Sequence, residues 1–362
     1  MDIEERSKNN KIHIIWIVIT IMLMIIGLCL FASINIYIDP LFHYHKPLKG
    51  YGYPLDNERY QNDGITRNFE YDSIITGTSM VENFNTSEAD EIFGADFIKV
   101  PFWGSRYKET NDNLQRAYDA GKDLVYVIRC LDYTMLVLDK DAYMEEGEYP
   151  TYLYNTDPFD DVKYVLNKEI LLTYTRNVIK NTNAGNKTTS FDEYQNWNDE
   201  YTFGAETVLS TYTLGEKAEM EQELSEDEAV IIYENIRQNV TDLADAHPET
   251  TFYLFFPPYS ICYWDTLDNA GQINWRIDAE QVAIEEILKH PNIKLYSFCD
   301  DFELICDLNN YKDQAHYGEW VNSWILEWMH DGEHLLTEEN YEGYIETIRK
   351  FYSSYDYSLL HG

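Results

Sequence analysis

Three residues at opposite ends of one long segment carry the side chains of a hydrolase triad: Ser79, Asp313 and His316. Ser79 follows an apolar, β-rich run at 71–76, which predicts a buried strand with the serine at its carboxyl end, where open α/β sheets carry their chemistry. Asp313 and His316 are three residues apart, which on a helical turn places both side chains on one side. The carboxylate can then orient the imidazole while the imidazole deprotonates the serine. The spacing therefore predicts nucleophilic catalysis by Ser79.

Strands and helices alternate along the segment that holds these residues. The predicted strands are 71–77, 97–100, 124–129, 251–256 and 292–297, and the predicted helices include 86–93, 105–120, 271–289 and 317–329. Such alternation predicts an α/β fold, a three-layer α/β/α domain over 71–362 with about five parallel strands. Residues around 133–250 exceed what a crossover needs and are interpreted as an insertion, with helical patterns at 158–180 and 216–246. This insertion is expected to roof or flank Ser79.

The N-terminus predicts a membrane anchor. Residues 12–38 are almost wholly apolar and long enough to cross a hydrocarbon core of roughly 30 Å as one transmembrane helix. Basic residues within 1–11 precede this span, which predicts a cytoplasmic N-terminus and an extracytoplasmic domain at the cell membrane. Residues 39–70 show no sustained period and are interpreted as an ordered juxtamembrane collar. A cleaved signal peptide is the alternative interpretation of the apolar run.

The formal net charge of −37 opposes binding of the whole chain to nucleic acid or to an anionic membrane surface through long-range electrostatics, so no nucleic-acid partner is expected. An anionic polymer as substrate would need a local basic patch. The candidates for such a patch are Arg59, Arg67, Arg106, Lys108 and Arg129.

Cysteine and histidine spacing gives no metal-ligand pattern and there is no phosphate-binding glycine-rich loop, so neither a metal nor a cofactor is expected. Cys299 and Cys306 are close enough in sequence to form a disulfide across a short loop, but spacing alone leaves that open.

The segments around Ser79 and around Asp313 and His316 together resemble the motifs of the SGNH (GDSL-type) hydrolase superfamily, and the resemblance covers roughly residues 70–330. In that family the nucleophilic serine follows the first strand, here in Gly77-Thr78-Ser79-Met80, and an Asp-x-x-His block comes last, here Asp313 to His316. The resemblance implies a flavodoxin-like sheet and an oxyanion hole made by the backbone amides of Ser79 and Gly104. Gly104 lets the backbone approach a substrate closely, and it lies at the start of a predicted helix, where free amides and the helix dipole favour negative charge.

The chain departs from the family at the third block, which normally offers an asparagine after the third strand. The residues there are Arg129 and Asp132. An ionised Asp132 would repel an oxyanion, so Arg129 is the better substitute donor, with Asp132 positioning it or lining the pocket. Tyr259 and Ser260 follow the fourth strand and are further candidates for the pocket.

A single anchor, an outward SGNH-like domain and a large insertion resemble the membrane-anchored acyl-transfer partners of cell-envelope polymer modification, such as the teichoic-acid D-alanyl-transfer and alginate acetylation proteins. That resemblance implies a multispanning membrane-bound O-acyltransferase as partner and a cell-envelope polymer as acceptor, with Ser79 carrying an acetyl or D-alanyl group as an ester. The alternatives are a surface carbohydrate or lipid esterase and a non-catalytic scaffold with a degenerate site.

Overall fold

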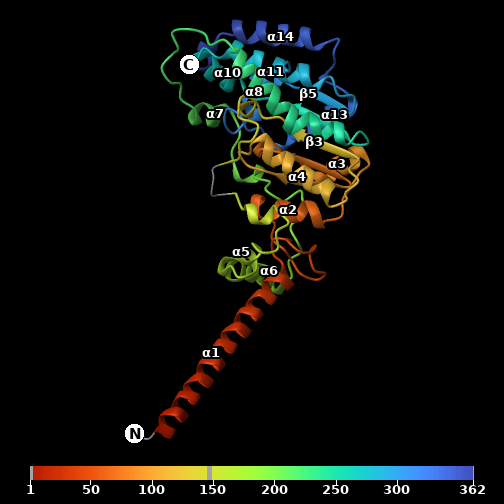
Figure 1. The fold of residues 1–362 in the computed structure, drawn as a ribbon. Coiled ribbons are helices and arrows are strands. Elements are labelled where there is room, and N and C mark those ends of the chain that lie inside the picture. Colours follow the sequence, from red (N-terminus) through yellow and green to blue (C-terminus); the bar gives the residue numbers. More distant parts are fainter. Residues whose placement is uncertain (1–2, 145–148, 362) are drawn as a thin grey trace.

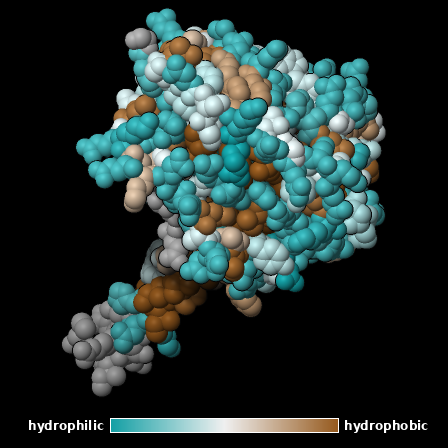
Figure 2. All heavy atoms as spheres, turned by 90° about the horizontal axis from the view of Figure 1, so that it is seen from above, coloured by the Kyte–Doolittle hydropathy of each residue, from teal (hydrophilic) through white to brown (hydrophobic). Residues whose placement is uncertain are grey.

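A long N-terminal helix leads into an α/β domain in the computed structural model, which describes residues 3–144 and 149–361 (Figure 1). The first two residues of the predicted cytoplasmic segment, and residues 145–148 of the predicted insertion, lie outside the described residues. The N-terminal helix, α1 (Ile3–Ile38), contains a stretch, Asn10–Ile38, that is long and apolar enough to span a membrane. Figure 2 shows this helix as a hydrophobic projection from a mostly hydrophilic domain.

The domain is built on a six-stranded sheet with the order β2-β1-β3-β4-β5-β6. All five predicted strands are present and parallel to their neighbours, while β6 is an unpredicted two-residue strand that pairs antiparallel with β5. The strands are β1 (Ser73–Gly77), β2 (Phe97–Pro101), β3 (Tyr126–Cys130), β4 (Thr251–Phe256), β5 (Ile293–Ser297) and β6 (Leu335–Leu336).

Helices cover both faces of the sheet because the strand order reverses at β1. Right-handed crossovers place α3 (Thr86–Phe93), between β1 and β2, and α4 (Tyr107–Asp119), between β2 and β3, on opposite faces. On one side α3 packs against α13 (Glu319–Asp331). The remaining helices of this part of the chain are α8 (Glu226–Ile236), α9 (Asp242–Ala246), α10 (Ile261–Asn269), α11 (Ile273–Ile287), α12 (Phe302–Cys306) and α14 (Tyr341–Ser354).

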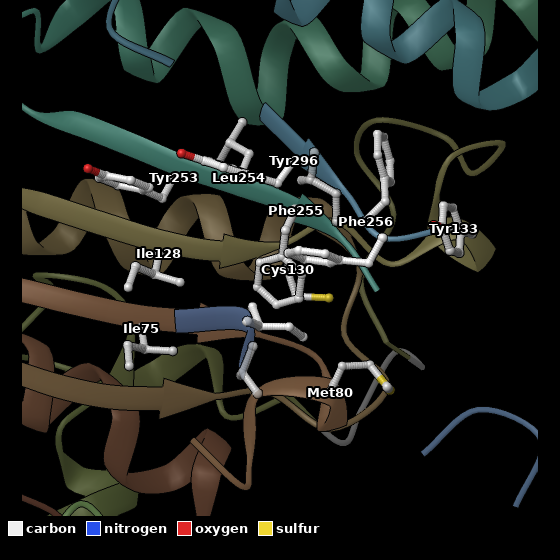
Figure 3. Packing of buried hydrophobic residues seen from close by; sticks show 14 of the residues in the cluster. Ile75, Met80, Ile128, Cys130, Tyr133, Tyr253, Leu254, Phe255, Phe256 and Tyr296 are labelled. Atoms are coloured by element: carbon white, nitrogen blue, oxygen red, sulfur yellow. The ribbon is translucent and has the colours of Figure 1, made fainter. Parts of the chain in front are cut away.

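The hydrophobic core follows the sheet. Ile75, Ile128 and Tyr253 are register partners on three adjacent strands, and Figure 3 shows them in one row across the sheet. The central strands are buried on both faces, which is why the chain carries continuous apolar runs there rather than alternating ones.

The ordered collar predicted at 39–70 contains, in its second half, a helix that was not predicted. Residues Glu58–Asn68 form α2, which begins where the Asn57 side chain accepts a hydrogen bond from the Tyr60 amide. The buried face of this helix is polar, so hydrophobic periodicity gives no signal for it. Asn62, for example, is fully buried and donates to the Pro101 carbonyl at the end of β2. The collar is therefore part of the domain.

The insertion is helical within both predicted patterns: a continuous helical run covers 226–246, and the region 158–180 holds shorter segments. Its first part contains α5 (Val162–Val165), a π-helical segment η4 (Ile170–Thr175) and α6 (Arg176–Asn183). After α7 (Ala205–Thr211), residues 216–225 are not helical, and α8 begins only at the capping serine, Ser225. In Figure 1, α5 and α6 lie beside the carboxyl end of α1.

Gly64, in the middle of α2, is expected to be essential for stability. A Cβ at this position would collide with the Leu41 carbonyl oxygen and lie 2.6 Å from that of Phe42, so the helix would have to move. Gly64→Ala should lower the free energy of unfolding by about 1–3 kcal/mol. Gly343→Ala is the matched control, because a Cβ there meets open space on helix α14 and should instead stabilise by roughly 0.5–1 kcal/mol. Similar thermal melting shifts for both variants would contradict this packing.

Candidate active site

The structure brings Ser79, His316 and Asp313 into hydrogen-bond contact. Ser79 Oγ lies 2.8 Å from His316 Nε2, and His316 Nδ1 lies 2.9 Å from Asp313 Oδ2. Burial raises the pKa of Asp313, but its hydrogen bonds and the charge of His316 outweigh burial and hold that pKa below the usual value. An ionised Asp313 can fix the imidazole orientation and would stabilise an imidazolium if His316 accepted the proton of Ser79.

The serine stands on a sharp turn at the point where the strand order reverses, between β1 and β3. Gly77 ends β1 with a positive φ of 153°, and a Cβ there would lie 2.8 Å from Cys130 Cβ, so only glycine fits. A short 3₁₀ helix, η1 (Ser79–Val81), starts at the serine itself. The side chain of Lys99, from β2, donates to the carbonyls of Glu82 and Phe84 and thereby holds the end of this turn.

The Asp313–His316 block forms a bend rather than the predicted helical turn. Tyr311 and Tyr317 pair across the base of the bend, and Asp313 Oδ1 accepts from the amides of Ala315 (2.9 Å) and His316 (2.8 Å). These bonds fix the carboxylate against the ring that it orients. The result is the same as on a helix, with both side chains on one side.

Ser260 supports this bend and does not line the pocket. Its hydroxyl and its amide both donate to the Gln314 carbonyl, at 2.8 and 3.1 Å. The end of β4 therefore holds the loop that carries Asp313 and His316, so the prediction of Ser260 as a pocket residue is wrong while its proximity to the site is confirmed.

Asp132 and Tyr259 are buried behind Ser79 rather than exposed in the pocket. Asp132 Oδ2 accepts hydrogen bonds from Thr78 Oγ1 (3.1 Å) and from the Tyr259 hydroxyl (2.8 Å). This network fixes the residue before Ser79. Asp132 therefore supports the serine turn, and its predicted place in the pocket lining is corrected, as is that of Tyr259.

Arg129 is not a substitute oxyanion donor. Its side chain is fully buried and donates to the carbonyls of Asn239 (2.7 Å) and Tyr107 (3.0 Å) and to Thr110 Oγ1. The Arg129 side chain thus links β3 to α4, the helix that contains Tyr107 and Thr110. Burial lowers the pKa of its guanidinium to about 10.

The predicted basic patch does not form either. Arg59 lines the pocket, but it donates to the buried Glu109 (3.1 Å), while Arg67 and Lys108 pair with acidic neighbours and Arg106 donates to the Gly104 carbonyl.

Gly104 lies in the loop after β2 with a left-handed φ of 61°. Neither its amide nor that of Ser79 donates a hydrogen bond to another of the described residues. Trp103, next to it, lines the same pocket as Ser79, and the Trp103 amide donates to Glu58 of α2. The role of the two amides as an oxyanion hole stays a prediction.

Ser79 and His316 open into a pocket of about 530 Å³, a volume typical of ligand sites. Three parts of the chain build its walls. Residues 56–60 come from the start of α2, Trp103 comes from the loop after β2, and the insertion supplies Met144, Tyr149 and the group Gln195, Trp197 and Tyr201. The expectation that the insertion flanks Ser79 is therefore confirmed.

Several pocket residues were missed by the sequence reasoning. Trp197 packs edge to face on the His316 ring, with centroids 5.7 Å apart. The Lys312 ammonium lies 3.6 Å from the ring centroids of both Trp197 and Tyr201. Gln195 adopts a left-handed φ of 56°, a conformation that costs a non-glycine residue free energy and often marks functional sites. Gln195 reaches the pocket only through the fold of the insertion, so no local sequence pattern could reveal its place there.

Two buried glutamates, Glu58 and Glu82, face the same pocket. Burial, the charge of Glu58 and a hydrogen bond to Glu58 together raise the pKa of Glu82 to about 9. Burial also raises the pKa of Glu58. The pair therefore holds a proton at neutral pH.

This shared proton makes stability depend on pH. Because the folded-state pKa of Glu82 lies above its ordinary value of 4.5, the folded state binds more protons, and stability falls as pH rises from about 4.5 towards about 9. Glu82→Gln mimics the protonated acid and should raise the melting temperature at pH 8 far more than at pH 4.5. The exposed Glu346→Gln is the control. If Glu82→Gln shifted the melting temperature equally at both pH values, Glu58 and Glu82 would not share a proton in the folded state.

The cysteines are all free: Cys299 is buried against the Tyr133 hydroxyl, and Cys306 is unpaired, so the structure contains no bridge between them. Within residues 3–144 and 149–361, no cluster of three or more His, Cys, Asp or Glu side chains could hold a metal ion.

Comparison with known proteins gives no match: no family model fits the chain, and neither a curated protein nor a solved structure is similar to it.

Proposed function

We propose that this protein is a membrane-anchored, extracytoplasmic serine acyltransferase or acyl-esterase of the SGNH type, acting in O-acylation of a cell-envelope polysaccharide or teichoic acid. The contact of 2.8 Å between Ser79 and His316, with Asp313 behind the imidazole, carries the proposal. The β2-β1-β3-β4-β5 strand order, which is that of flavodoxin-like sheets, supports the assignment to the SGNH type. An ordered triad also argues against a scaffold with a degenerate site.

The chemistry follows from the geometry in two balanced steps. Ser79 Oγ attacks the acyl carbonyl while His316 Nε2 takes the hydroxyl proton, and the leaving group departs with that proton as the acyl–serine ester forms. An acceptor hydroxyl then attacks the ester and gives its proton to His316, which returns it to Ser79 as the carbon–oxygen bond to the serine breaks. With water as acceptor the same cycle is hydrolysis.

The proposal also covers the position of the domain at the membrane, the donor of the acyl group and the polymer that accepts it. α1 holds the domain at the outer face of the cell membrane, with the basic residues that precede residue 12 on the cytoplasmic side. A multispanning membrane-bound O-acyltransferase supplies the acyl group, acetyl or D-alanyl, from across the membrane. Aromatic side chains at the pocket rim, Trp103 and Tyr201, are both more than half exposed and offer flat faces to the apolar side of a sugar ring.

This proposal is tested by measuring whether the acyl group is released as acid or transferred to a sugar. The full-length protein in detergent, supplied with a chromogenic acetyl ester, should release acid slowly and form acylated sugar when wall-polymer oligosaccharides are added, because the walls position an acceptor in line. Trp103→Ala should raise the KM for the oligosaccharide and leave ester cleavage without acceptor unchanged. Tyr233→Ala, an exposed tyrosine on α8, is the matched control.

Fast ester hydrolysis that no sugar acceptor changes, with no acylated product, would replace the transferase with the esterase. No ester cleavage at all by the folded protein would contradict both.

A further inference from the structure

Apolar side chains are exposed on the part of the insertion that lies beside α1. Phe159 is 88% exposed and Leu172 61%, and Val162, Leu166 and Ile179 are also exposed. They all fall within residues 159–179, around α5, η4 and α6. Large exposed apolar groups gathered on one short segment mark a contact surface rather than ordinary solvent exposure.

The same segment buries its other face against the domain. Tyr164 and Ile170 form a small core cluster with Leu41 and Leu153. Because this buried face points towards the domain, the exposed face points away from it. Figure 1 places α5 and α6 at the end of the domain from which α1 extends, which is the end nearest to the predicted membrane span.

The segment is fixed to α1 near the depth at which that helix leaves the bilayer. Asn35 is fully buried; its side-chain amide donates to the Val165 carbonyl (3.1 Å) and accepts from Thr175 Oγ1 (3.2 Å). The apolar stretch Asn10–Ile38 has 29 residues, which at a rise of 1.5 Å corresponds to roughly 43 Å, beyond a hydrocarbon core of about 30 Å. The turns around Asn35 therefore reach the headgroup region.

The charge of the segment is opposite to that of the chain. Residues 159–180 contain four basic side chains (Lys163, Lys168, Arg176 and Lys180) and three acidic ones (Asp160, Asp161 and Glu169), a net charge of +1 in a chain of net charge −37. All four basic residues are exposed. Apolar and basic side chains on one exposed face are typical of helices that lie in the membrane interface, where each cation near anionic headgroups contributes about 1 kcal/mol.

We infer that residues 159–180 form a membrane-contact platform, which inserts its apolar side chains into the outer leaflet of the bilayer that α1 spans and places its basic residues among anionic headgroups. This inference rests on the proposed membrane anchor. It does not depend on the reaction at Ser79. With α1 and the platform both in the bilayer, the domain has two attachments, so the pocket is held at a set height above the membrane rather than swinging on one helix.

Depth-dependent quenching tests the platform. The full chain, with Cys29 and Cys306 replaced by alanine, is given one new cysteine carrying an environment-sensitive fluorophore; the other three cysteines are buried. The protein is reconstituted in vesicles of phosphatidylglycerol and phosphatidylcholine with nitroxide-labelled acyl chains. The test position is Leu172→Cys, the reference within the span is Ile26→Cys, and the control is Glu346→Cys on α14, at the far end of the domain in Figure 1.

Leu172→Cys should be quenched several-fold more strongly than Glu346→Cys and nearly as strongly as Ile26→Cys, and Val162→Cys provides a second test position. Quenching at Ile26 but not at Leu172 or Val162 would overturn the platform alone and would leave that face for a protein partner. Absence of quenching at Ile26 would overturn the anchor and the platform together.

Discussion

Ser79→Ala will lose esterase and transferase turnover by a factor on the order of 10⁶, because the only nucleophile that the triad activates is gone. Binding should survive, since Ser79 Oγ makes one hydrogen bond, to His316, and the turn around it is fixed by Gly77, Thr78 and Lys99. The measurement is kcat and KM with a chromogenic ester, together with the melting temperature. Ser323→Ala, on α13, is the control for the loss of a serine hydroxyl elsewhere.

Residual activity within about tenfold of the wild type in a Ser79→Ala protein of unchanged melting temperature would place the nucleophile elsewhere. Loss of activity with a collapse in melting temperature would instead make the serine structural.

Double replacement of Ser79 and His316 will lose little beyond the worse single replacement. The two side chains act in one proton transfer, so once either is absent the other has nothing to contribute. His316→Ala alone should approach the loss of Ser79→Ala, and Asp313→Asn should cost on the order of 10⁴, because an amide stabilises the wrong imidazole tautomer.

Independent sites would multiply their losses instead. Multiplicative losses in kcat for the Ser79 and His316 pair would show that the contact between them does not serve catalysis.

The sheet and the triad were predictable because their signals are local or follow from topology. Runs such as 251–256 are apolar, rich in aromatic residues and closed by prolines, so the strands are visible without any tertiary information. Parallel strands place their carboxyl ends at one edge, which brings together Ser79 and the distant His316.

The parts that were missed depend on contacts between segments. Helix α2 buries Gln61, Asn62 and Asp63, which bond to the Pro40 carbonyl, the Pro101 carbonyl and Arg116 outside the helix, and hydrophobic periodicity cannot detect such a face. Arg129 was expected at the edge of the sheet because it lies near the end of a strand. Its side chain instead turns into the helical layer, where three acceptors surround it.

Trapping the acyl group on the serine is the most direct test of the central claim. The full-length protein is mixed with an activated acetyl ester, quenched in acid within one turnover, digested and analysed by mass spectrometry. The account predicts one acetyl group on the peptide that contains Ser79, absent from Ser79→Ala, and its loss when an acceptor hydroxyl is supplied before quenching. Ester turnover with the acyl group on another residue, or with no acyl-enzyme at any quench time, would contradict it.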